Sequence, residues 1–322
     1  MKAIQMSGPG GSEVLEYNNV QDPVPGSGDV LVKLKAIGVN YMDIYVRSGT
    51  YPIPSLQLIL GSEGAGEVLA IGDDVSGFKQ GDLVAYTGVP QSYAQKIVCP
   101  AWKLIKIPTG LDVDTAAAVM LQGITAQYLC KSTYPLGPGD TCLIHASAGG
   151  VGLLLTQMAK SLGATVIGTV STEEKGNISR SAGADYIINY KTHDFQKEVE
   201  AISDGKGIQV VYDSVGLDTF DKSIGCLATR GYMVLYGQSS GLVPPISPML
   251  LNSKSLFLTR PTLNSYIDNR AELESRASEV LNAVTEGTLK VSIHNKFALA
   301  DAAMAHDQLE GRLTTGKLLL VP

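Results

Sequence analysis

Apolar and polar positions alternate along much of the first 123 residues, which is the pattern of half-buried strands. Residues 30–36, 66–72 and 81–86 are predicted as strands on this ground. Glycines and prolines separate these segments about every ten residues, as in small barrels and sandwiches. We therefore expect a β-rich domain at the N-terminal end of the chain.

The pattern changes near residue 115, where a helix is predicted over residues 114–128. Beyond it, short continuous apolar runs alternate with helical stretches that carry one apolar face. The runs lie at residues 142–145, 165–170, 186–189, 210–213, 232–236 and 255–258, and helices are predicted at 150–161, 195–203 and 219–228. Strands that are apolar throughout and separated by helices predict a parallel sheet covered on both faces.

The last part of the chain is predicted as a helix at 269–286 and strands at 290–293 and 317–320, which return to the first domain. The predicted organisation is therefore a catalytic domain from residues 1–123 and 265–322, with an α/β nucleotide-binding domain at 124–264 inserted between them.

Composition narrows the class of protein. The chain has 322 residues, a formal net charge of -6 and four cysteines without a CxxC pair. The acidic balance disfavours a dedicated nucleic-acid-binding protein, and the spacing of the cysteines favours buried thiols. The N-terminus has no apolar core of a signal peptide, and no apolar run reaches the ~18 residues of a membrane span. We expect a cytoplasmic protein that does not enter a membrane.

A glycine-rich turn joins the strand at 142–145 to the helix at 150–161. This order of strand, glycine-rich turn and helix is the context that a dinucleotide-binding fingerprint requires. Gly149 and Gly150 allow the backbone to approach a pyrophosphate, Gly152 allows the helix to pack on the strand, and the N–H groups of the first turn bind phosphate. The predicted contacts are Ala148, Gly149, Gly150, Val151 and Gly152.

The end of the second strand of this domain bears on the choice of cofactor. NAD enzymes usually carry Asp or Glu here, whereas this chain has Thr169 and Ser171. Residues 171–174 fit a capping box, with Ser171 as N-cap and Glu174 three positions on. Lys175 follows in the first turn. From its position alone, Lys175 could pair with a 2′-phosphate or could equally be an ordinary solvated lysine.

The chain resembles the quinone oxidoreductases and ζ-crystallins of the medium-chain dehydrogenase/reductase superfamily. The resemblance extends over essentially the whole chain. Its matching residues are Gly139, Asp140, Leu143, Ser147, Ala148, Gly149, Gly150, Gly152, Gln157 and Lys160, the segments 38–51 and 211–216, and the loop 236–241.

This resemblance implies a Rossmann domain inserted into a GroES-like catalytic domain, and a homodimer formed through the Rossmann domains. It also implies NADPH as the cofactor, because the family places a lysine at the position of Lys175 in its 2′-phosphate site. Tyr190 matches the same site.

Zinc-containing alcohol dehydrogenases of this superfamily would carry their catalytic ligands at three positions of this chain. Asn40 replaces a cysteine, Ser62 replaces a histidine, and Gln122 lies in the region of the third ligand. Glu63 alone remains, and a catalytic zinc site needs three protein ligands. Only Cys99 lies near the place of the four-cysteine structural site. Both zinc sites are therefore expected to be absent, which disfavours ordinary alcohol oxidation.

Quinone reduction suits such a site, because the protein mainly has to hold NADPH and quinone in reacting geometry and stabilise charge that develops on oxygen. The candidate donors are Asn40, Tyr45, Arg47 and Tyr51. Asp43 is expected to orient Arg47 or a backbone group, with both side chains charged. The sequence selects no general acid, and it does not separate hydride transfer from single-electron transfer.

Further cofactor contacts are expected from the interdomain helix, from the carboxyl ends of the strands and from the C-terminal strand. They are Gln122, Thr125, Tyr190, Gly237, Ser239, Ser240 and Lys317. Lys317 is also compatible with a simple entry into a strand. Arg260 fits either a cofactor contact or a contact across a dimer.

Three other functions stay open at this point. An NADPH-dependent reductase of enones or aldehydes shares every feature above. Some ζ-crystallin-like proteins bind AU-rich RNA, although the acidic balance and the absence of an RNA motif speak against that as the main role. A crystallin-like protein would bind the cofactor without turnover.

Overall fold

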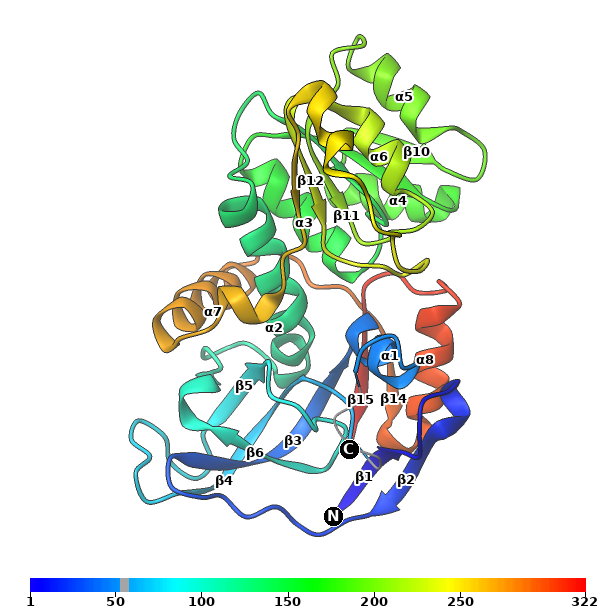
Figure 1. The fold of residues 1–322 in the computed structure, drawn as a ribbon. Helices are drawn as coiled ribbons and strands as arrows, with labels where there is room; N and C mark the ends of the chain where they lie inside the picture. Colours follow the sequence, from blue (N-terminus) through cyan, green and yellow to red (C-terminus); the bar gives the residue numbers. More distant parts are fainter. Residues whose placement is uncertain (53–57) are drawn as a thin grey trace. The chain divides into compact units, whose positions relative to one another are not determined.

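The computed structural model describes residues 1–52 and 58–322. The chain divides into two compact units, one of Met1–Ile124 with Ile267–Pro322 and one of Thr125–Tyr266. The chain passes from the first unit to the second within helix α2 and returns after Tyr266 (Figure 1).

Residues 125–266 form a six-stranded sheet in the order β10-β9-β8-β11-β12-β13, and every pair in it is parallel. Its strands are β8 (Thr141–Ile144), β9 (Thr165–Val170), β10 (Tyr186–Asn189), β11 (Ile208–Asp213), β12 (Leu227–Leu235) and β13 (Phe257–Thr259). Its helices are α3 (Gly150–Ser161), α4 (Glu173–Ser181), α5 (Phe195–Ile202) and α6 (Phe220–Cys226), with short helical turns at Leu129–Thr133, Pro248–Lys254 and Leu263–Tyr266.

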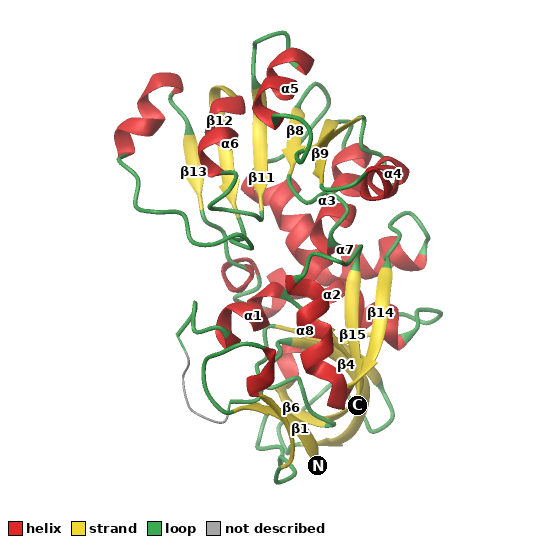
Figure 2. Cartoon of the chain, turned by 90° about the vertical axis from the view of Figure 1, so that its right-hand side faces the viewer, coloured by secondary structure: helices red, strands yellow, loops and turns green. Residues whose placement is uncertain are grey.

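This strand order reverses after β8, which is the arrangement of a Rossmann fold. Right-handed crossovers place α3 and α4 on one face of the sheet and α5 and α6 on the other, and Figure 2 shows helices on both sides. Leu143, Ile167 and Val211 are fully buried in the core between sheet and helices. The prediction of a covered parallel sheet is confirmed.

The described part of the other unit contains a seven-stranded, mostly antiparallel sheet in the order β14-β15-β3-β4-β5-β7, with β6 paired to β3. A two-stranded sheet of β1 and β2 accompanies it. The strands are β1 (Lys2–Met6), β2 (Leu15–Asn19), β3 (Asp29–Val39), β4 (Glu63–Ile71), β5 (Leu83–Thr87), β6 (Lys96–Pro100), β7 (Ile105–Lys106), β14 (Ile293–Ala298) and β15 (Lys317–Val321). The helices are α1 (Tyr41–Arg47), α2 (Val113–Tyr128, which continues into the second unit), α7 (Arg270–Thr285) and α8 (Ala302–Glu310), with short turns at Ser12–Val14, Ala101–Lys103 and Leu299–Asp301.

The C-terminal strand completes this sheet, because β15 pairs antiparallel with β3 and parallel with β14. Alternating side chains of β3, among them Val30, Val32 and Leu34, are buried in its core. The chain ends thus build one GroES-like unit, and the predicted insertion of a Rossmann domain into it is confirmed.

Several predicted elements differ from the structure in their bounds, and three of these differences are described here. The strand expected at 290–293 begins only at Ile293. Residues 227–228 belong to β12 rather than to a helix, because α6 ends at Cys226. Ser255 adopts a left-handed conformation (φ 50°), which cannot continue a strand, so β13 begins at Phe257.

Candidate active site

The glycine-rich turn of the Rossmann unit leads directly from β8 into α3. Gly149 is the N-cap of α3 and has no side chain with which to cap it, so the first-turn N–H groups lack a side-chain acceptor from the cap. A Cβ on Gly152 would lie 2.4 Å from the carbonyl oxygen of Ala146, which only glycine avoids. Gly149, Gly150 and Val151 are half-buried, and Ala148 and Gly152 are buried. This turn fits a bound pyrophosphate.

A buried hydrogen-bond network holds the turn in place. His145, the residue before the turn, contacts the Thr169 hydroxyl through Nδ1 and the Ser223 hydroxyl through Nε2, both at 2.9 Å. Ser223 donates to the carboxylate of Asp213 at 3.1 Å. The ends of β8, β9 and β11 are thereby joined, and burial lowers the pKa of His145.

Thr169 was predicted to contact the cofactor, but its side chain is 1% exposed and its hydroxyl is engaged by His145. The Thr169 side chain therefore stabilises the glycine-rich turn through His145. The sequence analysis did not identify this network, because His145 lies 24 residues from Thr169 and 78 residues from Ser223 along the chain.

The predicted capping of α4 was wrong by one residue. Thr172, not Ser171, is the N-cap, and its hydroxyl accepts a hydrogen bond from the backbone N–H of Lys175 at 3.2 Å. Lys175 is therefore the third helical residue. Ser171 and Lys175 are half-buried, and Tyr190 is 39% exposed after β10. These residues fit the adenosine end of a dinucleotide.

The loop after β12 carries the remaining predicted contacts of this unit. Gly237 donates its backbone N–H to the Asp213 carbonyl at 3.2 Å, and Ser239 donates to the Ser214 carbonyl at 3.1 Å. The Ser240 hydroxyl donates to the Val215 carbonyl at 2.8 Å, so its side chain stabilises the loop. Arg260 donates to the Leu235 carbonyl and to the Gln238 side chain, each at 3.1 Å.

Helix α2 carries two more predicted cofactor contacts. Thr125 is 6% exposed, and Gln122 is half-buried. Contact of these two side chains with the cofactor stays a prediction.

In the other unit, Asn40 is the N-cap of α1, directly after β3. Its backbone N–H donates to Asp43 Oδ2 at 2.9 Å, which forms a capping box with the Asn40 side chain. Asp43 was predicted to orient either Arg47 or a backbone group. The structure shows the second alternative, because Asp43 accepts from the backbone N–H of Asn40. Burial raises the pKa of Asp43 to about 7, well above its ordinary value.

The Asn40 side chain lies against a buried ion pair. Its Nδ2 donates to Glu63 Oε1 at 2.7 Å, and its Oδ1 accepts from Lys317 Nζ at 2.8 Å. Lys317 also forms a salt bridge with Glu63, and Leu121 donates its N–H to the second oxygen of Glu63 at 2.7 Å. Lys317 is 1% exposed. The expectation that it contacts the cofactor is therefore corrected: its ammonium is engaged inside this unit.

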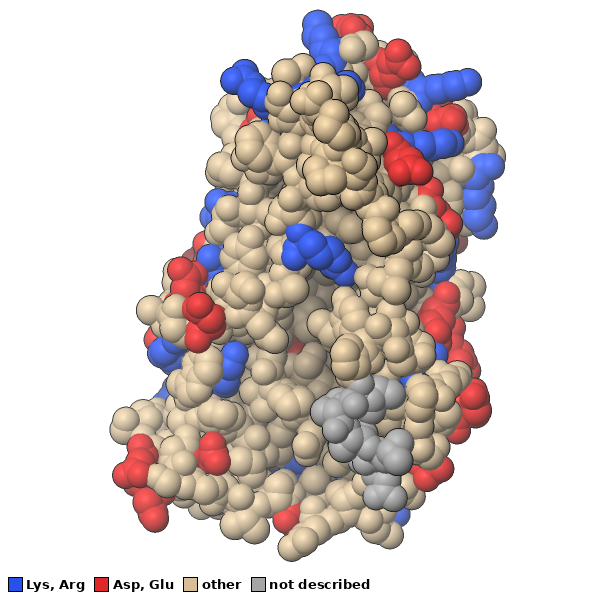
Figure 3. Space-filling model, in the orientation of Figure 1, with Lys and Arg blue, Asp and Glu red and all other residues tan. Residues whose placement is uncertain are grey.

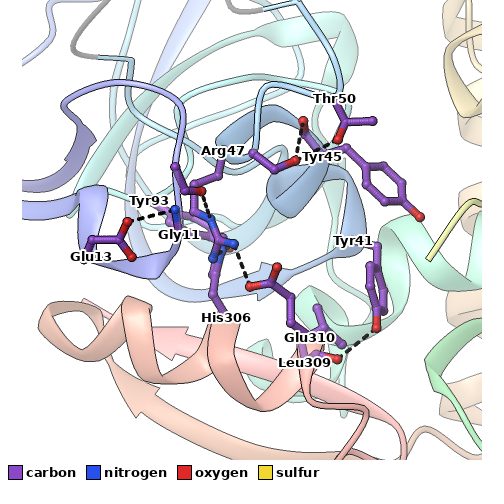
Figure 4. Close-up of polar contacts among 12 residues, drawn as sticks. Gly11, Glu13, Tyr41, Tyr45, Arg47, Thr50, Tyr93, His306, Leu309 and Glu310 are labelled. Atoms are coloured by element: carbon purple, nitrogen blue, oxygen red, sulfur yellow. Dashed lines mark hydrogen bonds and ion pairs between the residues drawn. The ribbon is translucent and has the colours of Figure 1, made fainter. Parts of the chain in front are cut away.

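Arg47 is also turned into the interior. Its guanidinium donates to the Gly10 carbonyl at 3.2 Å, to His306 Nδ1 at 3.2 Å and to Glu310 at 2.6 Å (Figure 4). All three guanidinium nitrogens are engaged by these partners, so its predicted role as a donor to the acceptor was wrong. The reason lies in α8, which the sequence analysis did not predict and which supplies both His306 and Glu310.

The two predicted tyrosines lie together. The rings of Tyr45 and Tyr51 are 5.3 Å apart in an edge-to-face arrangement, and both residues are half-buried. Figure 4 shows the Tyr45 ring on the side of α1 opposite to the Arg47 guanidinium. A neighbouring tyrosine, Tyr41, donates to the Leu309 carbonyl at 2.9 Å.

The three positions at which zinc dehydrogenases carry ligands do not fit a zinc ion here. They provide the carboxamides of Asn40 and Gln122 and the hydroxyl of Ser62, and the Glu63 carboxylate is occupied by the Lys317 ammonium. Zinc is bound by thiolate, imidazole and carboxylate. Within residues 1–52 and 58–322, no group of three His, Cys, Asp or Glu side chains is placed to hold a metal ion.

Two surface properties complete the description. None of the helices in the described ranges is long and apolar enough to cross a membrane. In Figure 3 most of the presented face carries no charged side chain, and the acidic and basic side chains lie mainly along its edges.

Comparison with known proteins agrees with these features. Residues 26–109 match the family model of the alcohol dehydrogenase GroES-like domain, and residues 150–283 match that of zinc-binding dehydrogenases. The chain is 47% identical to a quinone oxidoreductase of Pseudomonas aeruginosa, over 100% of this chain and 99% of the relative. It is 43% identical to a 2-haloacrylate reductase of a Burkholderia species, over 97% and 96% of the two chains.

Among solved structures, the Escherichia coli quinone oxidoreductase complexed with NADPH superimposes with a TM-score of 0.98 at 41% identity, with both chains covered completely. Because the identity extends over the whole chain and the fold, the chain belongs to the quinone oxidoreductase family of medium-chain dehydrogenases/reductases.

Proposed function

We propose that this chain is an NADPH-dependent quinone reductase that works without zinc. The observation that carries the proposal is the site at Asn40, where a carboxamide and a buried ammonium stand in place of metal ligands, in a chain that retains a dinucleotide-binding turn. Relatives that are named quinone oxidoreductases, one of them complexed with NADPH, support it.

The Rossmann unit holds the cofactor in this proposal. The first-turn N–H groups at Gly150 and Val151 bind the pyrophosphate, and Gly149, whose own N–H donates to the Ala146 carbonyl, lets the backbone approach it. Lys175 pairs with the 2′-phosphate, with Ser171 and Tyr190 beside it. Gln122, Thr125, Gly237, Ser239 and Ser240 are proposed as further contacts. The bound cofactor supplies two electrons, so that NADPH, a proton and a quinone give NADP⁺ and a hydroquinone.

The GroES-like unit holds the acceptor. Charge develops on a quinone oxygen during reduction, and a hydrogen-bond donor at that oxygen lowers the barrier. Asn40 has a side-chain N–H group, and Tyr45 and Tyr51 have hydroxyl groups, for this purpose. Their rings also offer flat apolar surface to a flat acceptor.

A second acceptor class is favoured by one observation. A 2-haloacrylate reductase is 43% identical to this chain, and its named substrate is an activated alkene. Reduction of an enone or similar alkene needs the same cofactor and the same donor at a carbonyl oxygen, so it is our second candidate.

We also propose that the protein is a homodimer and is located in the cytoplasm, as its resemblance to the family suggests. Among residues 1–52 and 58–322, β13 ends the Rossmann sheet and pairs with β12 alone, so its outer edge has no strand partner there. Phe257 and Leu258 on it are 49% and 36% exposed. An apolar edge strand is suited to pair with a second copy.

The test is NADPH consumption in chelator-treated buffer, with an ortho-quinone, a para-quinone and an enone compared side by side. NADH with each acceptor, and a simple alcohol with NADP⁺, serve as controls. Chelator-resistant consumption that depends on quinone is expected. Turnover of the enone alone would transfer the assignment to the second candidate, and binding of NADPH without turnover would contradict both.

A further inference from the structure

Lys317, Glu63 and Asn40 come from three neighbouring strand ends. Lys317 begins β15, Glu63 begins β4, and Asn40 directly follows β3, which pairs with both of the other strands. A Cβ at Gly38 would lie 2.1 Å from Glu63 Oε1, so a glycine here leaves room for the carboxylate. The pairing of the sheet therefore brings one cation, one anion and one amide to a single buried point.

The chemistry of these partners determines how the Asn40 amide is turned. An ammonium group only donates hydrogen bonds, so the atom of Asn40 that faces Lys317 must be the oxygen Oδ1. Nδ2 then faces Glu63, which accepts one of its two hydrogens. Nδ2 carries a second hydrogen besides the one that it donates to Glu63. The ammonium at Oδ1 also polarises the amide, which makes its N–H a stronger donor.

We propose that Lys317 and Glu63 are positioning residues for the reaction, which orient and polarise the Asn40 amide so that its second N–H donates to the acceptor oxygen that gains charge. This inference rests on the proposed function and extends it. Neither charged side chain contacts the cofactor or the acceptor in this arrangement.

A buried ion pair by itself often adds little to stability, and its replacement by neutral side chains is frequently tolerated. The pair variant Lys317→Met/Glu63→Gln, which removes both charges together, is therefore expected to fold. The matched control is Lys106→Met/Asp82→Asn, which removes a 2.9 Å ion pair from the same unit. Thermal unfolding, NADPH affinity by fluorescence titration, kcat and KM are measured for each.

We expect the pair variant to lose at least about tenfold in kcat, the effect of one donor in the transition state, with NADPH affinity within about twofold of the unaltered protein and an unfolding temperature close to it. In an Asn40→Ala background the same pair substitution should lower kcat no further, because the pair acts through Asn40. The control pair should leave kcat unchanged.

Three outcomes would overturn the inference. The first is a pair variant with the kcat of the control, and the second is a full additional loss in the Asn40→Ala background. The third is a loss of NADPH affinity of more than about tenfold with kcat retained, which would make Lys317 a cofactor contact.

A second variant is available if the pair variant does not fold. Exchange of the charges, Glu63→Lys/Lys317→Glu, keeps an ion pair. The Asn40 amide would then have to turn over, so that Oδ1 accepts from position 63 and Nδ2 donates to position 317. We expect it to fold with a similar loss of kcat, whereas undiminished kcat would overturn the inference.

Failure of the proposed function is distinguishable, because it is observed with the unaltered protein. If that protein reduces the enone and not the quinone, the variants are compared with the enone, whose oxygen also gains charge.

Discussion

The Tyr93 hydroxyl donates a hydrogen bond of 3.0 Å to Oδ2 of Asp43, at the base of α1. Its oxygen also lies 3.0 Å from Nε2 of His306, whose Nδ1 faces a nitrogen of Arg47. Arginine only donates, so Nδ1 accepts and Nε2 carries the proton that His306 donates to Tyr93. A directed chain thus runs from Arg47 to Asp43, the residue that caps the backbone of Asn40.

The stability of this cluster should depend on pH with two opposing slopes. Burial raises the pKa of Asp43 to about 7 from an ordinary 3.8, so its contribution to stability is present at low pH and is lost as pH rises through 7. Burial, with the charge of Arg47, lowers the pKa of His306 to about 3 from 6.5, so its contribution is present above 6.5 and is lost as pH falls through 3.

Replacement of Asp43 or His306 should leave only the pH dependence of stability that the other residue causes. From pH 4 to 7, Asp43→Asn should become steadily more stable relative to the unaltered protein as pH rises. His306→Gln should do so as pH falls from 6.5. Thermal unfolding at a series of pH values measures both differences, and equal slopes for the two variants would contradict the assignment.

Gly152→Ala should weaken NADPH binding by about tenfold or more. The new Cβ would lie 2.4 Å from the Ala146 carbonyl oxygen and 2.8 Å from the Ser147 Cα, so the backbone of the phosphate-binding turn must move. Fluorescence titration with NADPH measures the effect. Gly137→Ala is the control, because its Cβ would meet nothing within 4 Å, and an equal loss in both variants would argue against a specific role of the turn.

Lys175→Ala should raise the KM for NADPH far more than the KM for NADH, because only NADPH has the 2′-phosphate that a cation pairs with. Steady-state kinetics with both cofactors gives the ratio. Lys206→Ala, with its side chain 81% exposed in the same unit, is the control. If both KM values rise equally, the 2′-phosphate is held elsewhere.

Leu258→Glu should dissociate the proposed homodimer. Leu258 is 36% exposed on β13, the last strand of the Rossmann sheet in the described part of the chain, and a charge there opposes pairing of two edges. Sedimentation equilibrium of both proteins measures the change. Val321→Glu, an exposed position on β15 in the other unit, should leave the mass unchanged. A monomeric unaltered protein would contradict the dimer itself.

The elements with strong local patterns were predictable from the sequence. The bounds of α3, β9 and β10 agree with the predicted ranges to the residue, and the glycine-rich turn joins β8 to α3 as expected. Apolar periodicity and turn chemistry are properties of a few consecutive residues, which is why they can be read without the fold. Whole-chain resemblance added the cofactor and the family.

The tertiary structure alone decided which polar side chains face a ligand and which are engaged inside the protein. Arg47 and Lys317 appeared as candidate contacts, yet their partners His306, Glu310 and Glu63 lie 254 to 263 residues away in sequence. Lys317 could be read equally as a strand entry, and only the pairing of β15 with β3 brought it to Asn40. A buried charge requires a partner, but local sequence does not specify which distant strand or helix supplies it.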